Sequence, residues 1–296
     1  MSNAQDACLL CRLPDLRPVA SRCRDSEAHS VVQCRSCGLI QLSPTPGEAE
    51  HDRFHDLDLQ SQPILDTGNL DLVVARKTVD TARRVAFVRE RLPPNASLLD
   101  IGSGYGVLLR ELAREGFRVT GVEPSAARRE VSRQITNAPV VSASVYGLPP
   151  TLGRFDAVLL IHVLEHLVDP VRALSSLAEL VNQDGCVVVE VPNVADYLLE
   201  GSDEFRAFYW QQAHVSYFSP ETLESVLRRA GFKRVEIQGV QRYGLENLMA
   251  WLTTGRPQLT EPSFHTMGPY RWLEDGYKQQ LEADLRSDTL IAVGWF

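Results

Sequence analysis

Leu98-Leu-Asp-Ile-Gly102-Ser-Gly104-Tyr-Gly106-Val107 is the stretch of sequence that decides the fold. Its first half is a short apolar run that predicts a buried strand, and its glycines predict a tight turn into a helix. Glycines let a ligand lie directly against the backbone at the helix N-terminus. Glu123 follows Gly102 by 21 residues, at the end of the next apolar run. A carboxylate at that position can accept both hydroxyls of a ribose.

The spacing of the glycines separates two classes of nucleotide cofactor. A dinucleotide-binding fold has G-x-G-x-x-G or G-x-G-x-x-A, and the last small residue lets the helix approach a pyrophosphate. Here the glycines form G-x-G-x-G, and Val107 stands where that last small residue is needed. The pattern suits a ligand without a pyrophosphate and argues against a nicotinamide-dependent oxidoreductase.

Short apolar runs alternate with helical stretches on both sides of this turn. The expected strands are 97–101, 118–122, 140–143, 155–163, 186–191, 233–238 and 288–294, and the expected helices are 70–91, 107–115, 126–134, 171–181 and 220–230. Continuous apolar strands spaced by helices are typical of a parallel sheet covered on both faces. The sequence therefore predicts an α/β fold with a doubly wound, mostly parallel seven-stranded sheet.

The cysteines indicate a second, smaller unit. Five of the six fall within the first 37 residues, and four of them form two C-x-x-C pairs separated by 22 residues: Cys8, Cys11, Cys34 and Cys37. Two such pairs complete a four-thiolate structural zinc site, and Gly38 permits the second turn to close. Cys23 is expected to be a spare thiol and Cys186 a core residue. Buried or disulfide-linked cysteines are the alternative, which the lack of a secretion signal disfavours.

Composition limits the class of protein. The 296 residues are 44% hydrophobic and 23% charged, which excludes a disordered or low-complexity chain. The longest apolar stretch, 157–164, is too short to cross a bilayer. A net charge of −8 and a nearly neutral cysteine module argue against nucleic-acid binding, with an RNA-binding module as the minority alternative. We expect a soluble, cytoplasmic protein, with a homodimer as the candidate assembly.

Four segments follow along the chain. We expect a zinc-binding four-cysteine module (zinc ribbon) over 1–45 and a linker with an N-terminal helix over 46–92. A cofactor-binding core follows over 93–240. Residues 241–296 would form a helical insertion, with helices near 246–252 and 270–284, and the last strand of the core.

Three further motifs accompany the glycine turn: Val122-Glu-Pro-Ser125, Phe155-Asp-Ala-Val158 and His162-Val-Leu-Glu-His-Leu-Val-Asp-Pro170. Together the four resemble the class I S-adenosylmethionine-dependent methyltransferases over about residues 80–240. The last motif and the later His214-Val-Ser-Tyr-Phe218 resemble small-molecule methyltransferases that act on quinones, antibiotics and nucleotide-linked sugars. A cysteine-rich N-terminal module on such a domain is similar to the sugar C-methyltransferases.

The resemblance implies S-adenosylmethionine as the cofactor and assigns the positions that hold it. The methionine end would be held by Asp100, Gly102, Ser103, Gly104 and Gly106. Glu123 and Pro124 would hold the ribose, and Ser144 and Val145 the adenine. His162 would lie where the methionine part meets the acceptor.

Methylation of a hydroxyl or a carbon acid also requires removal of a proton, for which histidine is suited near neutral pH. The candidates are His166, which follows Glu165 at the mouth of the fourth strand, and His214, in an aromatic stretch after the fifth. We expect Glu165 to orient a partner. The alternatives are a helix-capping or cofactor-orienting His166 and ordinary packing of the aromatic stretch.

An acceptor pocket is expected from five further residues: Tyr209, Tyr217, Arg242, Tyr243 and Asn247. Arg242 could meet a phosphate or carboxylate of the acceptor. A dimerisation or core-covering element is the alternative for this region. The sequence thus predicts a methyltransferase for a small acceptor, with a nucleotide-linked sugar or natural-product intermediate first and O- or C-methylation open. The alternative is an RNA or protein methyltransferase that uses the zinc module for recognition.

Overall fold

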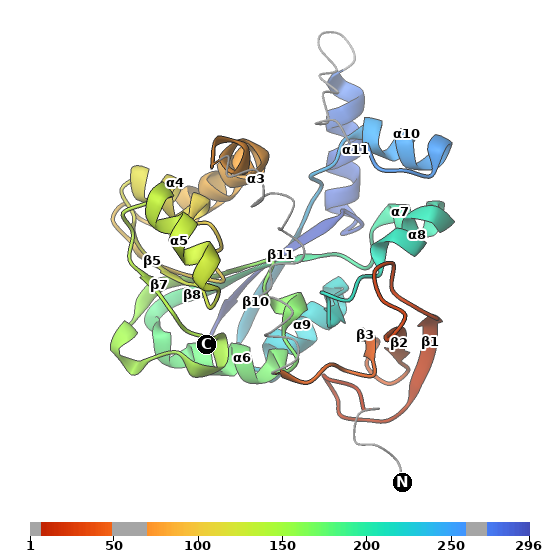
Figure 1. Cartoon of the computed structure of the whole chain (residues 1–296), viewed down its shortest axis with the longest axis horizontal. Coiled ribbons are helices and arrows are strands. Elements are labelled where there is room, and N and C mark those ends of the chain that lie inside the picture. The colour runs from red at the N-terminus through yellow and green to blue at the C-terminus, as the bar shows by residue number, and fades with distance from the viewer. Residues whose placement is uncertain (1–6, 49–69, 259–270) are drawn as a thin grey trace.

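The computed structural model describes residues 7–48, 70–258 and 271–296 (Figure 1). Its main sheet has the strand order β10-β11-β8-β7-β4-β5-β6. These strands are β4 (Ser97–Ile101), β5 (Arg118–Val122), β6 (Val140–Val141), β7 (Phe155–Ile161), β8 (Val181–Pro192), β10 (Arg234–Val240) and β11 (Thr289–Trp295). β11 runs antiparallel to both its neighbours, and the pairs among β4 to β8 are parallel. The predicted doubly wound, mostly parallel seven-stranded sheet is confirmed.

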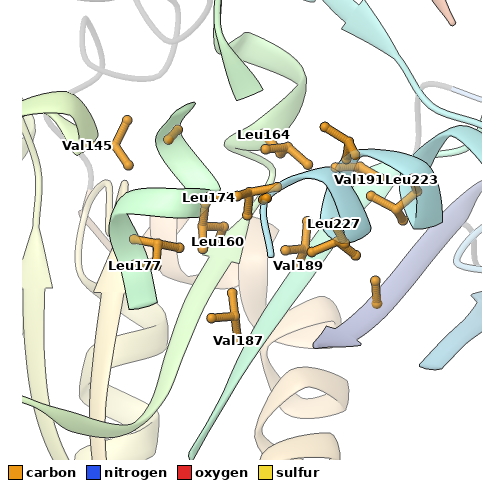
Figure 2. Packing of buried hydrophobic residues seen from close by; sticks show 14 of the residues in the cluster. Val145, Leu160, Leu164, Leu174, Leu177, Val187, Val189, Val191, Leu223 and Leu227 are labelled. Atoms are coloured by element: carbon orange, nitrogen blue, oxygen red, sulfur yellow. The ribbon is translucent and has the colours of Figure 1, made fainter. Parts of the chain in front are cut away.

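Helices cover both faces of this sheet (Figure 1). One face carries α3 (Leu70–Arg91), α4 (Val107–Arg114) and α5 (Ala126–Ile135), and the other carries α6 (Pro170–Ser176) and α9 (Pro220–Arg229). Side chains of β7 alternate between the two cores: Leu160 packs with α6 and α9, whereas Leu159 packs with α3 and α4. Figure 2 shows the first core, where Leu174 and Leu227 close over the strands.

Several predicted boundaries in the main sheet are wrong: the strand expected over 140–143 ends at Val141, and the strand expected over 233–238 continues to Val240. The strand expected to continue to residue 163 ends at Ile161, because His162 adopts a left-handed backbone with φ 54°. The strand expected to begin at residue 186 begins at Val181, since its exposed polar start, Gln183 and Asp184, lacks the apolar pattern of a buried strand. The helix expected over 171–181 ends at Ser176 and continues only as a 3₁₀ turn to Leu180.

A second sheet joins the cysteine module to the main domain. Its order is β1 (Leu16–Ala20), β2 (Ser30–Cys34), β3 (Ile40–Ser43) and β9 (Ser216–Tyr217). β3 pairs antiparallel with β9, and the Leu42 N–H donates to the Val215 carbonyl at 3.0 Å. The module is therefore built into the wall of the larger domain.

Besides α9, the described residues between β8 and β11 contain the helices α7 (Tyr197–Gly201), α8 (Asp203–Tyr209), α10 (Leu245–Thr254) and α11 (Arg271–Ala283). α7 and α8 lie beside the small sheet in Figure 1. The predicted linker over 46–69 falls mostly outside the described residues, whereas the helix predicted over 70–91 is α3. No helix within the described ranges is both long enough and apolar enough to span a bilayer.

Candidate active site

The glycine turn has one position that is open to a ligand. Gly102, Gly104 and Gly106 have φ values of 71°, 56° and 77°. A Cβ atom on Gly102 would lie 2.6 Å from Val163 Cγ2, and one on Gly106 would collide with the Ser132 side chain. At Gly104 the nearest atom would be 4.0 Å away. Packing thus requires glycine at 102 and 106, while Gly104 borders free space.

Glu123 ties this turn to the start of α5. Its side chain is buried; Oε2 accepts the Gly104 N–H at 2.8 Å and Oε1 accepts the Ser125 N–H at 2.9 Å. Each oxygen keeps a further lone pair. Ser103 Oγ is buried without a hydrogen-bond partner among the described residues. The Ser103 hydroxyl packs against Gly121, and the open glycine and the buried acceptor fit the sugar and methionine parts of S-adenosylmethionine.

The other predicted cofactor positions lie at or just after the carboxyl ends of β4, β5 and β6. Asp100 is buried at the end of β4, and Pro124 is exposed beside Glu123. Ser144 accepts the Tyr146 N–H at 3.3 Å and so caps a short turn after β6. Val145 packs in the core that contains α6, as Figure 2 shows.

His162 joins the glycine turn to a cavity. The next residue in the chain, Val163, contacts Gly102, and His162 itself lines the cavity. Its Nδ1 lies 3.0 Å from Glu165 Oε1, and its Nε2 lies 3.3 Å from Glu190 Oε1. Burial alone would lower the pKa of His162, but the hydrogen bonds to the two carboxylates outweigh it and raise that pKa. The structure therefore favours the protonated ring here.

The cavity has a volume of about 490 Å³ at the carboxyl ends of β7 and β8. Ligands of open parallel sheets bind at this edge, and the volume suits a small molecule. Its aromatic lining consists of Phe205, Phe208, Tyr209, Tyr243 and Trp251. Its titratable lining consists of Arg24, His162, Glu165, His166, Asp196, His214, Arg242 and Asp288.

The cavity brings together four of the five predicted acceptor residues: Tyr209, Arg242, Tyr243 and Asn247. Tyr217 is not among the lining residues. It is buried in the small core, where its hydroxyl donates to the Gln211 carbonyl at 2.9 Å. Arg24, Asp196 and Asp288 line the cavity but were not proposed from the sequence. Arg24 belongs to the cysteine module, and no sequence pattern indicates that this module reaches the site.

The three predicted catalytic side chains meet at one point in the cavity wall. Glu165, His166 and His214 each place one nitrogen or oxygen within 4.8 Å of the other two. The two rings are edge to face, with centroids 5.1 Å apart. Burial lowers the pKa of both histidines, that of His214 to about 3, so both rings are neutral at pH 7. Burial alone would raise the pKa of Glu165, but its hydrogen bond to His162 lowers that pKa to about 2.

The two arginines of the cavity are already neutralised or engaged. Arg242 Nε lies 3.1 Å from Asp288 Oδ1, and its NH1 lies 3.5 Å from Asp80 Oδ2. Arg24 donates to the Phe208 carbonyl at 3.0 Å and to Gln211 Oε1 at 2.7 Å. Their internal partners leave little capacity for a polyanionic ligand.

Asp196 gives the stability of this region a pH dependence. Burial, with Asp288 nearby, raises the pKa of Asp196 to about 7. The folded state therefore holds a proton that the unfolded state releases near pH 4, and the resulting stabilisation is lost as pH rises through 7. We expect the free energy of unfolding to fall by about 2–3 kcal/mol between pH 5 and pH 8 relative to Asp196→Asn. Urea unfolding of both proteins across this range is the measurement.

Asn is the matched replacement because its side-chain oxygen can still accept the Leu198 N–H, now accepted by Asp196 Oδ1 at 2.9 Å. Parallel pH profiles for the two proteins would show that the Asp196 carboxyl titrates normally.

The four predicted zinc ligands converge outside the cavity. Cys8, Cys11, Cys34 and Cys37 place their sulfur atoms within 4.8 Å of one another. In each pair the first cysteine's carbonyl accepts a 2.9 Å bond from the N–H four residues on, at Arg12 and Gly38, both with positive φ. Tetrahedral zinc with bonds of about 2.3 Å spaces its sulfurs by about 3.8 Å. The cluster fits such an ion, whereas Cys23 and Cys186 are buried elsewhere.

Fold and site together define a class I methyltransferase. The chain belongs to the methyltransferase domain family, which matches residues 75–237. A chain from the complex of a Haloferax volcanii methyltransferase with the Trm112 methyltransferase activator has a TM-score of 0.50 and 19% identity. It covers 77% of this chain and 95% of its own length, and this likeness shows the fold. The family supports S-adenosylmethionine as the cofactor.

The chain is also similar to curated proteins that are named as O-methyltransferases. The mitochondrial ubiquinone biosynthesis O-methyltransferase of Arabidopsis thaliana is 29% identical over 187 residues, covering 53% of this chain and 56% of that protein. The ubiquinone biosynthesis O-methyltransferase of Thiobacillus denitrificans is 28% identical over 171 residues, covering 53% of this chain and 73% of that protein. The chain thus spans little more than half the length of the first relative.

Proposed function

We propose that this chain is an S-adenosylmethionine-dependent O-methyltransferase of a small, uncharged acceptor that carries a hydroxyl group. The observation that carries the proposal is the junction at the end of β7. There Val163 contacts the glycine turn and the adjacent His162 lines the cavity. An acceptor in this cavity lies next to the site that fits the cofactor.

Different residues of the chain would hold the cofactor, orient the acceptor and activate its hydroxyl group. The glycine turn and Glu123 would hold the cofactor, which supplies an activated methyl group when bound. The cavity walls orient the acceptor and exclude water, which is the main protein contribution to such a displacement. Glu165, His166 and His214 face the cavity together and are the groups that we expect to activate the acceptor hydroxyl. Tyr209 adds a buried hydroxyl that has no partner among the described residues.

Charge and shape support a neutral acceptor. Arg242 is paired with Asp288, the protonated His162 is paired with Glu165, and the donors of Arg24 are engaged by the Phe208 carbonyl and Gln211 Oε1. The aromatic lining suits a flat or apolar molecule. The named reaction of the Arabidopsis and Thiobacillus relatives is also an O-methylation. A nucleotide-linked sugar comes second, because its diphosphate would need a cation that Arg24 and Arg242 do not spare. RNA or protein as the acceptor comes last, since a net charge of −8 and a nearly neutral cysteine module argue against a macromolecule-binding role for the module.

The remaining sequence predictions extend this proposal. We propose that the four-cysteine cluster of the N-terminal module holds a structural zinc ion, and that 1–45, 46–92, 93–240 and 241–296 are the working segments of the chain. Arg24 of the module lines the cavity, and β3 of the module pairs with β9, so we propose that the module supports the acceptor site. A cytoplasmic location and a homodimer stay predictions.

The test is methyl transfer from labelled S-adenosylmethionine to a panel of acceptors. The panel holds catechol-type and hydroquinone-type phenols, nucleotide-linked sugars, total RNA and a protein extract. We expect product only from the phenols, with the label on oxygen by mass spectrometry. Label on a sugar carbon, in RNA or in protein would overturn the proposed acceptor class. Tight cofactor binding without product from any acceptor class would overturn the enzymatic assignment.

A further inference from the structure

Glu165, His166 and His214 form the donor set of a metal site. Two imidazoles and one carboxylate place their donor atoms within 4.8 Å of one another, and all three side chains line the acceptor cavity. Two histidines and a carboxylate on one side of an ion, with the other positions open, is a set that binds divalent first-row metals. A site with three protein ligands and open positions is also typical of catalytic rather than structural metals.

The carboxylate supplies an independent sign that the site takes a ligand. Glu165 is 1% exposed, and its Oε2 is buried with no hydrogen-bond partner among the described residues. A buried carboxylate oxygen without a partner is energetically costly, because it is no longer hydrated and forms no hydrogen bond in place of those to water. A cation at the centre of the three donors would satisfy it.

His166 and Glu165 are already oriented by hydrogen bonds to neighbouring groups, as metal ligands require. His166 Nδ1 lies 2.7 Å from the Ala213 carbonyl, which can only accept, so the neutral ring donates there and carries its lone pair on Nε2. Glu165 Oε1 lies 3.0 Å from His162 Nδ1, which leaves Oε2 for the metal. Metal-binding histidines and carboxylates are regularly oriented through such second contacts.

His214 completes the set from a different segment of the chain. It lies on the segment that leads into β9, two residues before Ser216. Its ring nitrogens lie 3.1 and 2.9 Å from Gln211 Nε2, so the amide occupies the lone pair in this structure. A metal would take the place of that N–H. Gln211 could turn away while its Oε1 keeps the bond from Arg24.

We propose that Glu165 Oε2, His166 Nε2 and His214 bind one divalent first-row cation that coordinates the acceptor hydroxyl. The inference deepens the proposed function and rests on it for the identity of the acceptor, but not for the existence of the site. Coordination lowers the pKa of a bound hydroxyl. The hydroxyl proton passes to solvent, the oxygen pair forms the new bond to the methyl carbon, and the carbon–sulfur pair stays on sulfur. Metal coordination thus replaces proton transfer to either imidazole.

The experiment measures metal binding without acceptor or cofactor. The purified full chain is treated with a mild chelator, and Mn²⁺ is added while the spin-resonance signal of the free ion is followed. The four-cysteine cluster does not interfere, because thiolates select zinc over Mn²⁺. We expect one bound Mn²⁺ per chain, with nitrogen-14 modulation of its electron spin echo from the imidazoles. Co²⁺, which binds more tightly in the Irving–Williams order, is the second probe and is added while the four-cysteine cluster is kept loaded with zinc, so that Co²⁺ cannot bind there.

Three variants assign the ligands. His166→Asn keeps a donor for the Ala213 carbonyl but removes Nε2, Glu165→Gln keeps the shape of the side chain, and His214→Asn removes the third donor. Each is expected to weaken metal binding by about 100-fold or more and to retain S-adenosylmethionine binding, which verifies the fold. His29→Gln is the control, because His29 is buried in the cysteine module against the Pro44 carbonyl.

The inference is overturned if neither ion binds, if bound Mn²⁺ shows no nitrogen coupling, or if the three variants bind metal as the wild type does. A metal-binding protein that methylates nothing in the acceptor panel would instead contradict the proposed function alone. If methyl transfer survives complete removal of metal, the metal does not activate the acceptor, and His166 or His214 accepts the hydroxyl proton instead.

Discussion

Gly104→Ala is expected to fold and to lose about 100-fold or more in affinity for S-adenosylmethionine. Gly104 is the one glycine of the turn whose added Cβ would meet no protein atom closer than 4.0 Å. That space is where a ligand can approach the backbone, so a methyl group there collides with the cofactor and not with the protein. A 100-fold loss corresponds to about 2.7 kcal/mol. Isothermal titration with S-adenosylmethionine and S-adenosylhomocysteine measures it.

Gly116→Ala is the matched control. Gly116 also has a positive φ, 89°, and a Cβ there would meet no atom within 4 Å. Both variants therefore carry the cost of alanine in a left-handed backbone, about 1–2 kcal/mol, but only one lies at the cofactor turn. Equal cofactor affinity in the two variants would show that the cofactor does not bind beside Gly104.

The sequence predicts well the helices and strands whose ends are marked by proline or glycine residues. α3 ends at Arg91 because Pro93 and Pro94 follow, and β4 ends at Ile101 because the glycine turn begins at Gly102. The boundaries it misses depend on tertiary contacts. His162 leaves the strand pattern because its ring is held between Glu165 and Glu190, which lie on different elements.

The same distinction holds for the candidate site. The order of residues shows Glu165 and His166 side by side, but not that His214, 48 positions later, meets them. Arg242 is visible in the sequence as a possible anion partner, and only the fold shows that Asp288 neutralises it. Local patterns therefore identify the residue types, whereas long-range pairing decides which charges remain available to an acceptor.

Cys34→Ser is expected to remove the bound zinc and to destabilise the whole chain. Zinc sites of this type contribute much of the folding free energy of a small module. Here β2 ends at Cys34, and the sheet that contains it continues through β3 into β9. We expect the free energy of unfolding to fall by about 3 kcal/mol or more, within the range for loss of a metal ligand. Zinc content by mass spectrometry and urea unfolding test this.

Cys23→Ser is the control for the thiol change. Cys23 is buried in the small core, apart from the four clustered sulfur atoms, and burial raises the pKa of its thiol to about 11, so it is a neutral packing residue. We expect Cys23→Ser to keep its zinc and to lose about 1 kcal/mol. Loss of zinc from Cys23→Ser, or its retention in Cys34→Ser, would contradict the four-ligand assignment.

The two ligand sites should respond differently to Cys34→Ser. Arg24 and His214 reach the acceptor cavity from the module and from the segment paired with it, whereas the glycine turn lies between β4 and α4. In the fraction that stays folded, we therefore expect S-adenosylmethionine affinity within about threefold of wild type and methyl transfer lowered by about 100-fold, since misplaced positioning groups have such effects. A parallel loss of both would mean that the module supports the fold alone. Retention of both would separate it from the acceptor site.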